Sequence, residues 1–281
     1  GKSIALEAQG RAEELDDPLL LSKTSSLLGA YYKVMAEYGK GVTLLNRAVE
    51  LAEEGHDLRQ KAKSLLFLSE LLLYLGKVSE AQNYLKEALE IAKTHSLKRI
   101  FLEAACLQGL LAGKEKKESL ALQAYQAAFT TASEVQGAEK EKIILQLYQS
   151  QTYCDLHNPR EGLKLIPLLE KSIAQMNSQK LESEFLFIKG QLQIQSKQLP
   201  EGLAQLQAAF ELSRKIGYQA LLVDTLILLG QGYDYLGNSS LGTKFKDVAR
   251  KILTTQANSL EPDERNQYIL SKKRLSHVFQ N

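Results

Sequence analysis

Several features that would identify other classes of protein are missing from this 281-residue sequence. It has only two cysteines, Cys106 and Cys154, which favours a reduced chain with small, half-buried thiols over a disulfide or a redox pair. No apolar run approaches the ~20 residues that a membrane-spanning helix needs, and no signal peptide is visible. We therefore expect a cytoplasmic protein without membrane insertion.

A dominant charge and a recognisable catalytic motif are also missing. The net charge is +2, so no strong field attracts the chain to nucleic acid or to an anionic membrane. The four histidines are far apart, and none stands near Cys, Asp or Glu at metal-ligand spacing. The sequence has no nucleophile elbow, no paired carboxylates and no glycine-rich phosphate loop. We predict a protein that is not an enzyme and that has no catalytic residue, metal site or cofactor.

What the sequence does contain is a repeated pair of helices, best formed between Ala62 and Thr94. This stretch has the pattern of two amphipathic helices joined by a turn at Gly76-Lys77. Small residues stand where the two helices must cross, at Ser69, Ala81 and Ala88. Helices approach to ~8–10 Å only where such side chains are small. A single pair cannot bury its apolar face, so it needs similar pairs as neighbours.

Three small sites recur every 40 residues along the chain, with one step of 41. The first is Gly29, Ser69, Gly109, Ser150, Gly190 and Gly230; the second is Gly41, Ala81, Ala121, Gly162, Gly202 and Gly242; the third is Ala48, Ala88, Ala128, Leu169, Ala209 and Ala249. Only Leu169 is large. A continuous repeat of this kind predicts one solenoid without a separate second core.

The arrangement of Leu68-Ser69, Leu72, Gly76, Ala81, Leu85 and Ala88 resembles the tetratricopeptide repeat. The resemblance covers six repeats, from about Ser22 to Thr255, although the usual repeat length is ~34 residues. It implies an all-α fold, a right-handed α-α superhelix whose first helices line a concave groove. The 40-residue length is similar to long-helix variants in scaffold proteins, bacterial peptide-sensing regulators and the sensor arms of signalling ATPases.

The repeat frame divides the chain into three parts. Residues 1–17 match the second helix of a repeat whose first helix is missing, so we expect a fragment of a longer protein. Residues 18–256 hold the six repeats. Residues 257–281 are expected to form a C-terminal capping helix from Pro262 to about Gln280, which would cover the last apolar face. The alternative is a detachable partner-binding helix bearing Lys272, Lys273 and Arg274.

Repeat four is the irregular one. It shows the 41-residue step, Leu169 in place of alanine, and Pro167 inside its second helix. An interior proline removes a backbone hydrogen bond and clashes with the preceding turn. We expect this helix to kink or to begin late, and the solenoid to change direction there.

The resemblance also indicates which side chains face the groove. The candidate partner-binding residues are Lys23, Lys33, Lys63, Glu70, Tyr74, Gln151, Asp155, Gln191, Gln195, Gln231, Asp234 and Tyr235. Gln151, Gln191 and Gln231 occupy equivalent sites, and such a ladder can pair with the backbone of an extended peptide. Alternatively, these glutamines are simply good helix formers on a wet face. The groove changes from basic to acidic along the chain.

We predict that the chain is a non-catalytic scaffold, the tetratricopeptide-repeat arm of a larger intracellular protein, which binds a protein or peptide in its concave groove. The alternative is a ligand-sensing regulatory arm of a signalling ATPase, kinase, cyclase or transcription regulator. Family members that clamp the C-terminal carboxylate of chaperones use a lysine and two asparagines. The matching positions here are Ser26, Ala30, Leu66 and Glu70, which exclude that type of clamp.

Overall fold

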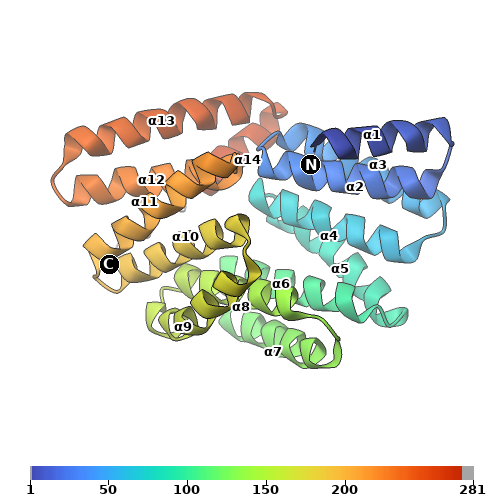
Figure 1. The fold of residues 1–281 in the computed structure, drawn as a ribbon, viewed down its shortest axis with the longest axis horizontal. Coiled ribbons are helices and arrows are strands. Elements are labelled where there is room, and N and C mark those ends of the chain that lie inside the picture. The colour runs from blue at the N-terminus through green and yellow to red at the C-terminus, as the bar shows by residue number, and fades with distance from the viewer. Residues whose placement is uncertain (1, 274–281) are drawn as a thin grey trace.

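The computed structural model describes residues 2–273, and every regular element in this range is an α-helix. The helices are α1 (Lys2–Glu14), α2 (Pro18–Val34), α3 (Tyr38–Glu54), α4 (Leu58–Tyr74), α5 (Val78–Thr94), α6 (Lys98–Lys114), α7 (Glu118–Glu134), α8 (Glu139–Asp155), α9 (Pro159–Met176), α10 (Gln179–Gln195), α11 (Leu199–Ile216), α12 (Gln219–Tyr235), α13 (Ser239–Asn258) and α14 (Pro262–Lys273). Successive pairs from α2–α3 to α12–α13 stack side by side (Figure 1). The predicted all-α solenoid is confirmed.

The helices are joined by turns of one recurring geometry. Most helices are 17 residues long and are followed by three connecting residues, which gives a 20-residue unit, half the sequence period. After α4, Lys77 N donates to Leu72 O at 2.9 Å and Gly76 N donates to Leu73 O at 3.1 Å. This is the Schellman pattern, which satisfies the last carbonyls of a helix and reverses the chain.

The Schellman pattern needs one residue in the left-handed region, and Gly76 has a φ of 81°. The same conformation returns about every 20 residues, in many turns without glycine. The positions with positive φ are Asp16, Ala36, His56, Gly76, Ser96, Lys116, Gly137, His157, Asn177, Lys197, Gly217 and Gly237.

Every position of the small-residue frame is buried, Leu169 included. Within a pair, the backbones come close enough for side chain to meet main chain: Ser69 Oγ donates to Ala81 O at 2.8 Å. In the fifth pair a Cβ atom on Gly190 would lie only 2.9 Å from Gly202 O. The predicted crossing sites are therefore where the two helices of a pair touch.

The irregularity in the middle of the chain lies before repeat four rather than within it. The connection between α7 and α8 has four residues, 135–138, and contains Gly137 with a φ of 69°. The extra residue of the 41-residue step therefore lies in this connection. Of the helices that precede it, α8 packs more against α6 than against α7, whereas α4, α6, α10 and α12 each pack more against the helix just before them than against the one before that.

The second helix of repeat four does not begin late. Helix α9 runs without interruption from Pro159 to Met176, with Pro167 inside it. Pro167 lies on an exposed face, so water can reach the backbone carbonyl that loses its partner. Leu169 is fully buried against the neighbouring helices.

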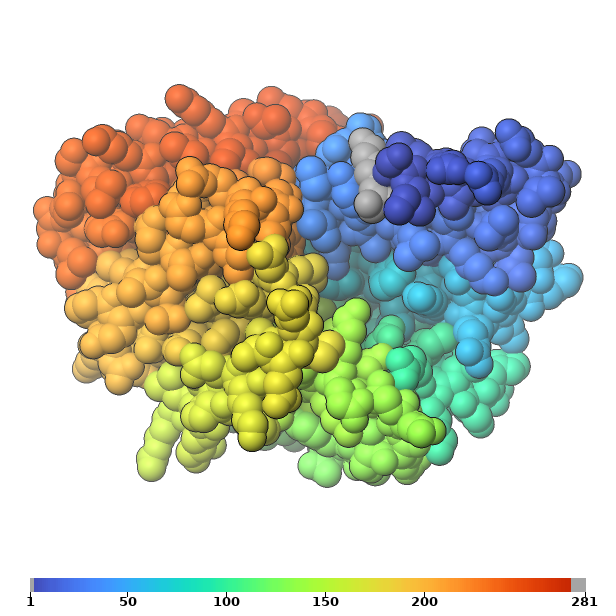
Figure 2. Space-filling view, in the orientation of Figure 1, coloured from blue at the N-terminus to red at the C-terminus, as the bar shows by residue number. Residues whose placement is uncertain are grey.

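The solenoid curves until its two ends meet (Figure 1). Helix α12 contacts α2, and the red and blue surfaces adjoin in Figure 2. Ala257, Leu260 and Tyr268, from the C-terminal end, belong to the same hydrophobic cluster as Tyr38 and Leu45 from the first pair. The helix predicted to cap the C-terminal end thus also covers the N-terminal repeats. Its predicted continuation to about Gln280, with Arg274, lies outside the described residues.

No helix within residues 2–273 is both long enough and apolar enough to span a bilayer.

The backbone contact in the fifth pair gives a test of the packing. We expect Gly190→Ala to lower the free energy of unfolding by about 1–2 kcal/mol, because overpacking costs ~1–3 kcal/mol and the higher helix propensity of alanine returns up to ~1 kcal/mol. Gly10→Ala in α1 is the control, since a Cβ there meets no atom within 4 Å. Urea denaturation measures both. Equal midpoints for the two variants would contradict the close crossing.

Candidate binding cavity

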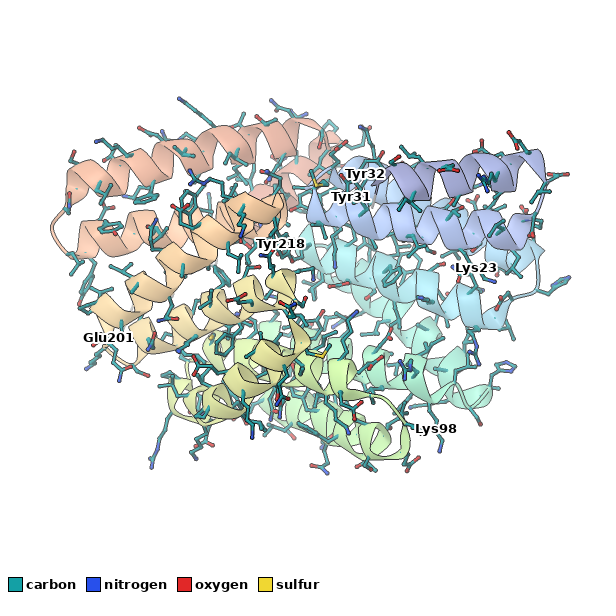
Figure 3. The ribbon with its side chains drawn as sticks, viewed as in Figure 1. Lys23, Tyr31, Tyr32, Lys98, Glu201 and Tyr218 are labelled. Carbon is teal, nitrogen blue, oxygen red and sulfur yellow. The ribbon has the colours of Figure 1, made fainter. Side chains whose placement is uncertain are left out.

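The first helices of the pairs enclose a cavity of about 390 Å³ on the inner face of the solenoid. Residues of α4, α6, α8, α10 and α12 form most of its wall, and α14 contributes Ser271 and Lys272. Figure 3 shows Tyr218 towards the middle of the molecule and Lys23 at its rim. The inner face of the curved solenoid is therefore hollowed into a cavity, and α14 forms part of its wall.

Tyrosine side chains form one part of this wall. Tyr148 Oη donates to Glu70 Oε1 at 3.1 Å, and Tyr218 Oη donates to Glu184 Oε1 at 2.7 Å. Burial, together with the nearby carboxylates, raises the pKa of Tyr74, Tyr148 and Tyr218 well above its usual value. These hydroxyls stay protonated, and those of Tyr148 and Tyr218 act as hydrogen-bond donors.

The carboxylates of the wall are paired with lysines. Glu70 lies 2.5 Å from Lys33 Nζ, and Glu184 lies 2.8 Å from Lys180 Nζ. Asp224 lies 2.6 Å from Lys272 Nζ. Because each of these negative charges has a positive neighbour, the charged groups create no strong net field in the cavity.

Glu70 has the most informative electrostatic environment of these groups. Burial alone would raise the pKa of its carboxyl, but the Lys33 ammonium outweighs this effect. The Tyr148 hydroxyl adds a further hydrogen bond to the charged form. The pKa of Glu70 is therefore lowered, and the carboxylate stays charged in the folded protein.

Part of the predicted glutamine ladder is formed on α8 and α10. Gln191 Nε2 donates to Gln151 Oε1 at 3.5 Å, and Gln151 Nε2 donates to Asp155 Oδ1 at 3.3 Å. Gln195 Nε2 donates to Cys154 O at 3.0 Å. Each of these three side-chain amides thus donates a hydrogen bond to another group of the protein.

Two acceptor atoms at this end of the ladder have no hydrogen-bond partner. Gln195 is only 6% exposed, and its Oε1 accepts no hydrogen bond. Asp155 Oδ2 also accepts none, although Lys114 Nζ lies 3.7 Å away. Buried acceptors normally have a partner, because an unpaired one costs free energy. This end of the cavity is chemically suited to an N–H donor.

The predicted partner-binding residues fall into two groups. The cavity is lined by six of them: Glu70, Tyr74, Gln151, Asp155, Gln191 and Gln195. Lys33 lies behind the wall as the ion-pair partner of Glu70. The others do not line the cavity: Lys23, Lys63, Gln231, Asp234 and Tyr235.

The second group points elsewhere for identifiable reasons. Lys23 and Lys63 are exposed, and Tyr235 is 69% exposed. Asp234 forms an ion pair with Lys246 of α13. Gln231 is not among the residues that line the cavity, so it does not extend the ladder of α8 and α10 into it.

Sequence reasoning missed three lining residues of chemical importance: Tyr148, Tyr218 and Lys272 as a wall residue. Tyr148 precedes Gln151 by one helical turn on α8, which is a usable signal. Glu184 and Asp224 occupy equivalent positions on α10 and α12. Lys272 could not be placed, because its position depends on the closure of the solenoid.

The two thiols are not part of reactive sites. Cys106 and Cys154 are buried and unpaired, and burial raises the pKa of both thiols. Within the described range, no group of three or more His, Cys, Asp or Glu side chains is arranged to hold a metal ion.

Comparison with known proteins agrees with the repeat frame. Residues 20–94 match the sequence model of the tetratricopeptide repeat family. Tetratricopeptide repeat protein 29 of Macaca fascicularis is 25% identical over 132 residues, which cover 47% of this chain. The matched segment spans only 28% of that curated relative. These two matches support the predicted resemblance to the tetratricopeptide repeat family.

Solved structures with a similar fold include Rap proteins. A Rap protein complexed with Competence and Sporulation Factor has a TM-score of 0.65 and 14% identity, over 93% of this chain and 76% of that one. The apo form of RapI has a TM-score of 0.64 and 14% identity, over 90% and 91%. Aspartyl phosphate phosphatase F from Bacillus subtilis has a TM-score of 0.58 and 15% identity, over 88% and 73%. At these identities the likeness concerns the fold.

The lowered pKa of Glu70 predicts a pH dependence of stability. A carboxyl whose pKa is lower in the folded state stabilises the protein above its unfolded value, 4.5, and this contribution is lost as the pH falls through the folded value. We expect Glu70→Gln to be less stable than wild type at about pH 7, with the difference shrinking below about pH 4.

Urea denaturation over a pH series measures the effect. Glu54→Gln, at an exposed site on α3, is the control and should follow the wild-type curve. If the free energies of unfolding of Glu70→Gln and wild type differ by the same amount at all pH values, the Lys33–Glu70 ion pair does not lower the pKa of Glu70.

Proposed function

We propose that this tetratricopeptide-repeat chain is a non-catalytic binding scaffold whose inner cavity takes a short extended peptide segment of a partner. The observation that carries the proposal is the part of the cavity wall formed by Gln195 and Asp155, whose buried Oε1 and Oδ2 atoms have no hydrogen-bond partner. The cavity volume of about 390 Å³ lies within the range of ligand pockets, ~300–1,000 Å³. That size suits a few residues of extended chain.

The hydrogen-bond acceptors and the tyrosine rings of the cavity wall can recognise different parts of a peptide. Backbone N–H groups of an extended segment can donate to the amide and carboxylate acceptors on α8 and α10. The rings of Tyr74, Tyr148 and Tyr218 offer an amphipathic surface for a side chain. The proposed site keeps the six predicted residues that line the cavity: Glu70, Tyr74, Gln151, Asp155, Gln191 and Gln195.

The fold comparison supports this type of use. A Rap protein with the same fold was solved in complex with Competence and Sporulation Factor. We also propose a cytoplasmic location, which is supported by the two unpaired thiols, Cys106 and Cys154.

A second candidate is a regulatory arm that senses a small ligand, and the presence of α14 in the cavity wall favours it. A long partner helix needs a continuous open groove, whereas Ser271 and Lys272 of α14 occupy part of the inner face here. In this case the arm would belong to a larger signalling protein and would transmit binding as a change in curvature.

Binding of short peptides by the full chain tests the leading proposal. We expect members of a tetrapeptide library to raise the melting temperature, because a ligand that binds only the folded state stabilises it. Asp155→Asn replaces one acceptor oxygen by a donor and should weaken the best peptide by about tenfold or more, which corresponds to ~1.4 kcal/mol.

Asp234→Asn is the matched control, since it makes the same change outside the cavity and should leave the affinity within about twofold. A panel of small metabolites tested in the same way distinguishes the two candidates. Peptide binding that is equally insensitive to both substitutions would exclude this cavity as the site.

A further inference from the structure

We propose that helix α14 is a latch: it joins the two ends of the solenoid, and its release opens the inner cavity. The contacts between α14 and the repeats hold this latch closed, and they are separate from any contact with the proposed peptide ligand. Three residues carry it, Glu264, Tyr268 and Lys272, which are four positions apart and therefore share one face of the helix.

Lys272 connects residues from opposite ends of the chain. Its Nζ lies 2.6 Å from Asp224 Oδ1 on α12, and the two side chains are only 7% and 13% exposed. The same ammonium lies 4.8 Å from the ring centroid of Tyr74 on α4. A cation over an aromatic face is attracted by the ring, most strongly when water is excluded. One side chain thus bridges the second and the sixth repeats.

Tyr268 fills the gap next to this bridge. Its side chain is fully buried, and its ring centroid lies 5.1 Å from that of Tyr38 at the start of α3. Its hydroxyl donates to Gln256 Oε1 of α13 at 2.6 Å. The ring therefore belongs to the N-terminal core, while the hydroxyl is held by the C-terminal repeat.

The third contact lies at the turn between α4 and α5. Glu264 is 3.0 Å from Lys77 Nζ, and both side chains are about 15% exposed. Beside it, Gly76 has no room for a side chain, because a Cβ there would lie 3.0 Å from Ser271 Cβ and 3.1 Å from Gln267 O. The turn and α14 are in direct contact.

The interface between α14 and the repeats has the features of a reversible contact. Of the twelve residues of α14, only Tyr268 and Lys272 are buried, so few side chains must leave their partners when it is released. Direct contact between α2 and α12 is slight by comparison with the stacking inside the solenoid. Because Ser271 and Lys272 also form part of the cavity wall, release of α14 widens the ring and uncovers the cavity.

A distance across the ring, measured on the ligand-free full chain, tests the latch. Spin labels at Glu54→Cys on α3 and Arg250→Cys on α13 report it by pulsed electron paramagnetic resonance. Both sites are exposed, whereas the native thiols are buried and have a raised pKa, so they escape labelling. The test variant is Asp224→Asn with Lys272→Met, which removes both charges together and leaves no buried charge unpaired.

We expect the double variant to give longer and broader distances and at least about tenfold faster amide exchange in α14, because each tenfold change is a shift of ~1.4 kcal/mol in the opening equilibrium. Lys251→Met, on the exposed face of α13, should match the parent. Unchanged distances together with unchanged exchange would overturn the latch.

If the double variant does not fold, Glu264→Gln decides the matter, since it removes one partly exposed contact and leaves the buried pair intact. A smaller widening in the same direction supports the latch, and identical distances refute it. Since no peptide is present in these measurements, the result is independent of whether the cavity binds the proposed ligand.

Discussion

The close approach of two helices at their crossing is the constraint on which the rest of this structure depends. Gly190 and Gly202 bring two backbones into contact, and Ser69 reaches the carbonyl of Ala81. Such contacts fix how each helix lies against the next, and the recurring left-handed turn residue fixes where the chain reverses. Curvature in a solenoid is the sum of these small and similar rotations. After six pairs the sum brings the two ends together, and the cavity and its closing helix both follow from that.

The fold could be predicted to a large extent from the sequence, because it is encoded locally. The spacing of Ser69, Ala81 and Ala88 identifies both helices and their crossing without knowledge of any distant residue. The location of the irregularity was harder. Pro167 has a strong intrinsic effect, but its exposed position lets α9 continue through it, whereas the neutral-looking loop at 135–138 changes the packing of α8. Local sequence patterns did not show that the tertiary structure would accommodate Pro167 within a helix and would change its packing at the loop 135–138 instead.

The site was predicted only in part, and the division has a physical origin. Gln151, Asp155, Gln191 and Gln195 line the cavity because they lie on the inner faces of helices in the middle of the arc. The same frame applied near the end of the solenoid gave Asp234, which bonds to Lys246 in its own pair. Lys272 lies at the cavity only because α14 is brought beside the second repeat, where its ammonium lies over the ring of Tyr74. A contact of that kind depends on the total curvature, which no single repeat contains.

The meeting of the two ends has a consequence for how such a chain can evolve. An open array can gain or lose one unit and keep its remaining contacts, so repeat number drifts freely in many solenoid families. Here the last helix must arrive beside the first pairs, where Tyr268 meets Tyr38 and Lys272 meets Tyr74. Insertion or deletion of one 40-residue unit would turn the final helix away from these partners. Closure therefore ties the contacts of Tyr268 and Lys272 to the number of repeats that lie between them and the first pairs.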